Sequence, residues 1–169
     1  MKPFKIVNCL SILALSLMSL NVGIVNAEVK LKLINGEKFR DYKSSGQTSK
    51  QSLKTVKKQL SKLFTELSEK HLEKGLSLEI EVVELDLPGI YHYGYGSSNR
   101  DIRVIDTPTP YQIKFNYKLL DSNSQTVKEG EYKIKDFYDS PNKMRKNRNK
   151  GAVWYYEDEL VKWFESLKG

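Results

Sequence analysis

Residues 77–89, SLEIEVVELDLPG, decide the fold through the alternation of their apolar and polar side chains. Apolar residues occupy every second position up to Val82, as in a half-buried strand, and from Val83 they continue in the opposite phase. One extra residue at this point would keep a single face of the strand buried, so we predict a β-bulge between Val82 and Val83. The other face carries Glu79 and Glu81. Because opposite charges stabilise neighbouring strands, we expect basic strands beside this one.

Four other segments have strand periodicity, and three of them are basic. Residues 28–34, EVKLKLI, alternate strictly. Residues 111–119 alternate again, and the turn DSNSQ leads into a hairpin partner at 126–137, where Gly130 is a candidate for a second bulge. The lysines on the polar faces of these strands are Lys30, Lys32, Lys114, Lys118, Lys133 and Lys135. The short run DIRVID, 101–106, predicts one further strand.

Helical periodicity follows the first strand. In residues 49–74, side chains recur at spacings of three and four, which indicates an amphipathic helix with one buried stripe. The stripe contains Leu53, Val56, Leu60, Leu63, Phe64, Leu67 and His71. A cap at Thr48 or Ser49 should begin the helix, and Gly75 should end it. For His71 we expect a packed, hydrogen-bonded side chain and not a ligand.

A second helix is predicted in the closing segment, WYYEDELVKWFESLKG. Its apolar stripe contains Tyr156, Leu160, Trp163, Phe164 and Leu167. The acidic residues of the first turn, from Glu157 to Glu159, suit the positive end of the helix dipole. Two helices with one apolar stripe each can cover one face of a sheet. We therefore predict an α+β two-layer sandwich in the order β-α-β-β-β-α, with four to five mostly antiparallel strands and both helices on one face.

Residues 1–27 have the features of a cleavable signal peptide. Two lysines precede an uncharged apolar run, and Val25-Asn26-Ala27 supplies small residues for cleavage. An uncleaved membrane anchor is the alternative, because the run is close to the roughly 20 residues that span a bilayer. Cleavage would leave one domain, 28–169, without the chain's cysteine and with a net charge lowered from +7 to +5. We expect a periplasmic protein of a Gram-negative envelope, without a transmembrane segment after cleavage.

The segment 86–101, DLPGIYHYGYGSSNRD, is the first candidate site, and we expect a loop there. The candidate binding residues in and beside it are Tyr91, His92, Tyr93, Tyr95 and Arg103. Three tyrosine rings on one face of a short ribbon could stack on a sugar or a base, or dock a partner protein. The alternative is that the rings cap the open end of the core.

The basic segment 142–150, NKMRKNRNK, is the second candidate site. Its candidate binding residues are Lys143, Arg145, Lys146 and Arg148. Each basic group near an anionic membrane contributes about 1 kcal/mol, so the segment could bind an anionic envelope surface. The alternative is a solvated loop without a specific partner. We do not expect nucleic acid as the partner, because an exported protein seldom meets it.

Three runs of the sequence resemble a proteobacterial exported family known as domain of unknown function 3016. They are EKFRDY, VELDLPGIYHYG with DIRVIDTPTPYQIKFNYKLLD, and WYYEDELVKWF. The positions that match the family pattern are Lys38, Phe39, Asp41, Asp86, Leu87, Gly89, Arg103, Pro110, Tyr156, Glu157, Trp163 and Phe164. The sequence departs from the pattern at Pro88, Tyr111 and Asp158, and Leu85-Asp86 keeps only one of two aspartates. The resemblance implies an exported protein of this architecture and carries no activity with it.

The sequence contains no nucleophile elbow, phosphate loop or zinc-protease motif. His92 lies near Asp86, Asp101 and Asp106 in sequence, but one histidine with irregularly spaced aspartates is a weak signal, so we predict neither a metal nor a cofactor. We expect a non-enzymatic binding protein or an envelope-assembly accessory factor, whose partner is an envelope protein or an anionic envelope surface. The alternative is a hydrolase of an envelope polymer that uses Asp86, His92, Asp101 or Arg103.

Overall fold

The structure is a computed structural model that describes residues 28–105, 108–138 and 151–168. The predicted signal peptide at 1–27 and the basic segment at 142–150 lie outside the described residues, and so does Asp106.

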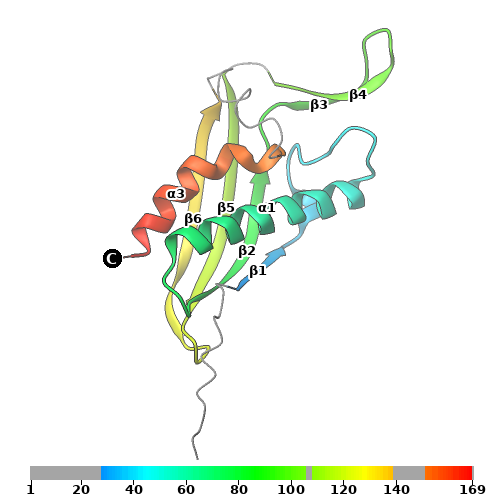
Figure 1. The fold of residues 1–169 in the computed structure, drawn as a ribbon. Coiled ribbons are helices and arrows are strands. Elements are labelled where there is room, and N and C mark those ends of the chain that lie inside the picture. The colour runs from blue at the N-terminus through cyan, green and yellow to red at the C-terminus, as the bar shows by residue number, and fades with distance from the viewer. Residues whose placement is uncertain (1–27, 106–107, 139–150, 169) are drawn as a thin grey trace, which may run out of the picture.

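The described chain forms a four-stranded sheet, a separate two-stranded sheet and two α-helices (Figure 1). The elements are β1 (Val29–Leu33), η1 (Gly36–Lys38), α1 (Ser49–His71), β2 (Ser77–Asp86), β3 (Ile90–Tyr95), β4 (Arg100–Val104), β5 (Thr109–Leu120), β6 (Thr126–Tyr138), η2 (Ala152–Tyr156) and α3 (Glu157–Ser166). The main sheet has the order β1-β2-β5-β6. Its first pair is parallel and the other two are antiparallel, so the α+β class and the mostly antiparallel sheet are confirmed.

The predicted element order is wrong at one place. The segment expected to be a loop contains β3, and β3 pairs with β4 outside the main sheet. The DIRVID strand therefore belongs to a separate hairpin and does not add a fifth strand to the main sheet. Pro88 and Gly89 precede β3 and residues 96–99 form the tip, so Gly94 is the loop former that falls within a strand of this hairpin.

The β-bulge in β2 is confirmed. The register of β2 against β5 shifts between Val82 and Glu84, and both Val82 and Leu85 are buried as a result. The expected charge pairing is also present, because Glu79 lies opposite Lys30 of β1 and Lys118 of β5. The acidic strand therefore lies between two basic ones.

Gly130 does not form a bulge. It lies opposite Tyr117 in regular register, and the irregularity of the β5–β6 pair is between Leu119 and Leu120. A Cβ at Gly130 would lie 3.2 Å from the Tyr117 hydroxyl oxygen. Glycine is used here because the Tyr117 ring occupies the space above this position.

Both helices cross the same face of the main sheet (Figure 1). A capping box begins α1: the Thr48 hydroxyl accepts from the Gln51 amide at 3.3 Å, and the Gln51 side chain accepts from the Thr48 amide at 2.8 Å. The helix ends at His71, a few residues before the predicted boundary at Gly75. His71 is packed and hydrogen-bonded as expected, since its Nδ1 lies 2.6 Å from a Glu165 carboxylate oxygen.

Trp163 of α3 forms the centre of the core between the helices and the sheet. Its ring lies 4.9 Å from Phe115, 5.2 Å from Tyr117 and 6.0 Å from Phe64, edge-to-face in each case. These contacts join both helices to β5.

Candidate binding site at the β3–β4 hairpin

The β3–β4 hairpin projects beyond the main sheet (Figure 1) and has two chemically different faces. Ile90 lies opposite Val104, and His92 lies opposite Ile102. Opposed residues of antiparallel strands point to the same side, so these four side chains form one face, which we call the apolar face. Tyr91 and its partner Arg103 point to the other side.

The second face of the hairpin packs against the segment that joins β1 to α1. The Tyr91 hydroxyl donates to the Asp101 carboxylate at 3.2 Å and lies 3.4 Å from the Ser44 carbonyl. The Lys43 ammonium donates to the Tyr93 hydroxyl and lies 5.1 Å from the centre of the Tyr93 ring. Residues some fifty positions apart in sequence therefore hold this face in place.

Arg103 holds the base of the hairpin through backbone carbonyls. Its guanidinium donates to the carbonyl oxygens of Asp41, Lys43, Leu87, Pro88 and Gly89. The bond to Lys43 is 2.9 Å long, and those to Pro88 and Gly89 are 3.2 Å. Burial lowers the pKa of Arg103. Arg103, a candidate binding residue, thus links β4 to residues 41–43 and 87–89, and we call this set of hydrogen bonds the clamp.

The three tyrosines do not share one face, contrary to the sequence-based expectation. The register of the hairpin shifts between His92 and Tyr95. A one-residue shift moves a side chain to the opposite side of a strand. Tyr91 and Tyr93 therefore meet at 4.9 Å on one face, whereas the Tyr95 ring lies 5.4 Å from His92 on the apolar face. The rings do not cap the core either, because Tyr93 and Tyr95 are 64% and 50% exposed.

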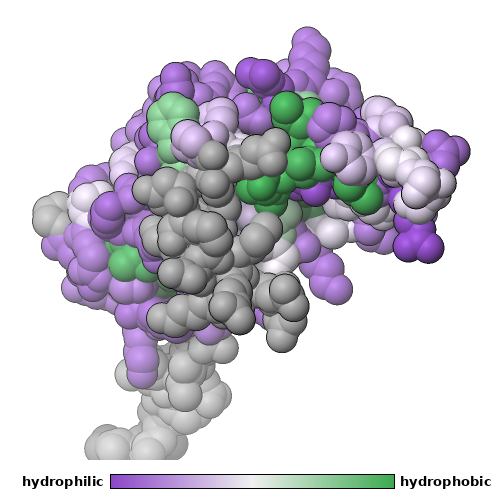
Figure 2. All heavy atoms as spheres, turned by 90° about the horizontal axis from the view of Figure 1, so that it is seen from above, coloured by the Kyte–Doolittle hydropathy of each residue, from purple (hydrophilic) through white to green (hydrophobic). Residues whose placement is uncertain are grey.

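A hollow of about 310 Å³ lies where the apolar face meets the main sheet. Ile90, His92 and Val104 line it from the hairpin, and Arg40 and Asp86 line it from the sheet end. Ile90 is 63% exposed. Figure 2 views this end of the molecule and shows hydrophobic side chains gathered beside the hairpin. The hollow therefore combines an apolar wall with a small number of charged groups, as binding sites commonly do.

Asp86 is the most perturbed acid of the hollow. Burial raises the pKa of its carboxyl above the ordinary 3.8, and Arg40 opposes this shift. The Arg40 guanidinium lies 3.8 Å away, but its side chain is 80% exposed and therefore offsets little of the cost of burial. The Tyr156 hydroxyl fixes the position of the strand end by donating to the Asp86 carbonyl at 2.9 Å.

Most of the residues that match the family pattern lie at the base of this hairpin. Asp41 accepts from the Tyr91 amide at 3.3 Å, Asp86 and Gly89 line the hollow, Arg103 is the clamp, and Tyr156 supports Asp86. Phe39 and Trp163 are core residues instead, and Glu157 begins α3. Sequence reasoning missed Ile90 and Val104. The available signal was the apolar alternation of Ile102 and Val104, and Ile90 beside the glycines of the segment had no such pattern.

The residues considered for hydrolysis do not form one constellation. Asp86 and His92 line the hollow, whereas Asp101 and Arg103 point to the opposite face of the hairpin. Within residues 28–105, 108–138 and 151–168, no three histidine, cysteine or acidic side chains are grouped to hold a metal ion. The described part of the chain also has no helix long and apolar enough to cross a membrane.

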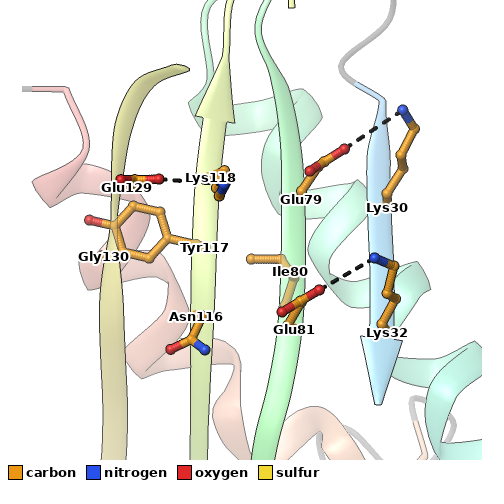
Figure 3. Close-up of a pocket in the computed structure, with 10 residues that line it drawn as sticks. All are labelled: Lys30, Lys32, Glu79, Ile80, Glu81, Asn116, Tyr117, Lys118, Glu129 and Gly130. Atoms are coloured by element: carbon orange, nitrogen blue, oxygen red, sulfur yellow. Dashed lines mark hydrogen bonds and ion pairs between the residues drawn. The ribbon is translucent and has the colours of Figure 1, made fainter. Parts of the chain in front are cut away.

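A second, shallower hollow of about 640 Å³ lies over the helix-free face of the main sheet (Figure 3). Its charged groups are paired across strands: Lys30 with Glu79 at 3.9 Å, Lys32 with Glu81 at 3.3 Å and Lys118 with Glu129 at 3.7 Å. Every charged group of this hollow thus has a partner of opposite charge in a neighbouring strand. The hairpin hollow is the stronger candidate because the large apolar side chain of Ile90 is 63% exposed beside it.

We expect Asp86→Asn to stabilise the protein increasingly as the pH is raised from about 4 to about 7. The buried carboxyl keeps its proton to a higher pH in the folded than in the unfolded chain. Folding therefore takes up protons above the ordinary pKa of 3.8, and this group lowers stability as the pH rises through that window. Urea unfolding of parent and variant at both pH values measures the difference, and a difference independent of pH would contradict the prediction.

Comparisons with known proteins give one family and several distant structures. The family described as "Protein of unknown function (DUF3016)" matches residues 27–166. No curated protein matches the sequence.

The similar solved structures include a "putative lipoprotein" from Caulobacter crescentus CB15, with 10% identity, a TM-score of 0.36 and coverage of 83% of this chain and 89% of that one. They also include a minor lipoprotein from Acinetobacter baumannii, with 8% identity, a TM-score of 0.34 and coverage of 85% and 96%. A hypothetical protein from Chlamydia trachomatis has 10% identity, a TM-score of 0.34 and coverage of 85% and 95%. TM-scores this low do not establish a shared fold.

Proposed function

We propose that this chain, which belongs to the DUF3016 family of proteins of unknown function, is an exported periplasmic protein that binds another envelope protein and has no enzymatic activity of its own. The observation that carries the proposal is the exposed apolar face of the hairpin, with Ile90 63% exposed beside the hollow. Export rests on the signal-peptide pattern of residues 1–27, and an accessory role in envelope assembly is the process we infer.

The shape and composition of the site favour a protein segment as the occupant. Ile90 and Val104 form an aliphatic wall of the hollow, and Tyr95 extends the same face of the hairpin beyond it; such surfaces are found at the centre of protein interfaces. Asp86 and Arg40 at its edge can form hydrogen bonds with a polar side chain or backbone group. The clamp at Arg103 fixes the hairpin before binding, which lowers the entropy lost on association.

The alternative, hydrolysis of an envelope polymer, has less support from the geometry. General acid–base catalysis needs its groups within hydrogen-bond reach of one reacting centre. The Asp101 carboxylate accepts hydrogen bonds from the Tyr91 hydroxyl and the Gly94 amide, and the Arg103 guanidinium donates to backbone carbonyls. Only Asp86 and His92 of the four candidates face the hollow.

A photo-crosslinking residue at position 90 tests the proposal in intact cells. Ile90 is 63% exposed, and Lys57 is an exposed residue of α1 that lies outside both sheets, so position 57 is the control. We expect one discrete crosslinked partner from position 90 and none from position 57. Identification of the partner by mass spectrometry then names it. Equal crosslinking patterns at both positions, or none at either, would contradict a binding role for the hairpin.

We expect the basic segment to add affinity for anionic envelope surfaces. Replacing Lys143, Arg145, Lys146 and Arg148 with glutamine should weaken retention on vesicles that contain anionic lipid at low salt, because each basic group contributes about 1 kcal/mol near such a surface. The matched control replaces four exposed lysines of α1, Lys50, Lys54, Lys57 and Lys58, with glutamine. Equal losses in both variants would show that net charge alone is responsible.

A further inference from the structure

Among the residues that the structure describes, no strand pairs with the outer edge of β6, which spans Thr126–Tyr138. β6 is the last strand of the main sheet, and in the part of the chain that the structure describes it pairs with β5 alone. A groove of about 310 Å³ runs along this edge, lined by the residues from Tyr132 to Asp136 and by Glu159 of α3. An unprotected edge of this kind offers unpaired backbone groups to another strand.

The charges of β6 are arranged symmetrically around Tyr132. Glu129, Glu131, Lys133 and Lys135 alternate with residues of the opposite face, and all four are exposed. The two acids precede Tyr132 and the two lysines follow it at the same spacings. If the strand is reversed and laid beside itself, each charge therefore meets its opposite.

We propose that β6 pairs antiparallel with β6 of a second copy of this chain, centred on Tyr132, so that two four-stranded sheets become one continuous sheet. In this register Glu131 faces Lys133 of the second copy, and Glu129 faces its Lys135. The two-fold axis repeats each pair, as in every symmetric dimer of this type. Cross-strand pairs of opposite charge stabilise such an arrangement.

The charge pattern also selects the register. If the centre moved to residue 131, Glu131 would lie opposite Glu131 of the second copy. If it moved to residue 133, Lys133 would lie opposite Lys133 of the second copy. Like charges directly opposite one another destabilise a strand pair. The centre at Tyr132 is the register in which both acids meet lysines, so the sequence specifies a single arrangement.

Pairs within one copy leave these side chains available to the second. Glu131 lies 2.8 Å from Lys114, and Glu129 lies 3.7 Å from Lys118. The two glutamate side chains nevertheless remain 54% and 60% exposed, and each carboxylate has a second oxygen for a further lysine. Because the paired strands run antiparallel, the two β3–β4 hairpins would lie at opposite ends of the joint sheet.

Two double variants test the pairing. Glu129→Lys with Glu131→Lys makes the four positions basic, and Lys133→Glu with Lys135→Glu makes them acidic. We expect the parent protein to sediment as a dimer, each variant alone to self-associate on the order of 100-fold more weakly, and an equimolar mixture of the two to form a heterodimer. Sedimentation velocity across a concentration series measures all three, and circular dichroism of each variant establishes that it is folded.

The variant that carries all four substitutions provides a check that does not depend on mixing. It reverses the four charges and keeps every opposite pair across the proposed interface, so it should dimerise as the parent does. The exposed pairs with Lys114, Lys118 and Glu84 within one copy become like-charged, which is why circular dichroism is needed to establish that this variant is folded. A parent protein that is monomeric at every concentration would overturn the proposal. Folded double variants that dimerise as well as the parent, or that stay monomeric when mixed, would overturn it as well.

Discussion

Replacing Arg103 with methionine is expected to lower the free energy of unfolding by about 3 kcal/mol. Methionine keeps much of the length of the arginine stem but has no donor, so the carbonyls of the two segments that Arg103 binds, 41–43 and 87–89, lose their common partner. Two of these carbonyls, at Lys43 and Gly89, belong to segments that are far apart in the sequence. Buried carbonyls left without a donor destabilise a fold more than the net gain from the original bonds suggests.

The effect of Arg103→Met should be concentrated at the hairpin. Urea unfolding measures the global loss, and hydrogen exchange should show faster exchange of the amides of β3 and β4. Arg100→Met is the matched control, because Arg100 lies in the same strand with an exposed side chain and should change stability by less than about 0.5 kcal/mol. If the clamp positions the apolar face for binding, Arg103→Met should also abolish the crosslink from position 90. Equal stability of the two variants would contradict the structural role given to Arg103.

Local patterns were sufficient to predict the main sheet and its helices. The phase change at Val82 predicts the bulge because a buried face must stay continuous, and the lysines beside Glu79 follow from pairing across strands. The cap at Thr48 is likewise a local motif. Each of these features depends on residues that are close in sequence or directly opposite in a sheet, so periodicity and charge are enough to indicate them.

The candidate site depends on contacts that have no local signature. Arg103 binds backbone carbonyls, and these are present in every residue whatever its side chain. Lys43 and Tyr93 meet across fifty positions of sequence without any periodicity that links them. The tyrosine alternation predicted one face, but a register shift near Gly94 moved Tyr95 to the other. A single sequence therefore identifies the segment but not the side that it presents to a partner.

Gly89→Ala is expected to lower the free energy of unfolding by about 4 kcal/mol. Gly89 has a φ of +90°, which L-residues rarely adopt, and it lies at the point where β2 ends and the hairpin begins. A Cβ here would overlap the carbonyl oxygen of Val104 and lie 2.7 Å from Ile105 Cγ1. These atoms are backbone and a packed side chain, so they cannot move aside without separating Ile90 from Val104.

Gly75→Ala separates the two causes of that loss. Gly75 has nearly the same φ, +89°, but a Cβ there would meet no atom within 4 Å. This control therefore carries the backbone strain alone, about 1–2 kcal/mol, and the difference between the variants measures the steric overlap at the hairpin. We expect Gly89→Ala to lose at least about 2 kcal/mol more than Gly75→Ala in urea unfolding. Similar losses would show that the base of the hairpin can rearrange to accommodate a methyl group. The apolar face would then not be fixed in position before a partner binds, which would contradict the preorganisation we propose.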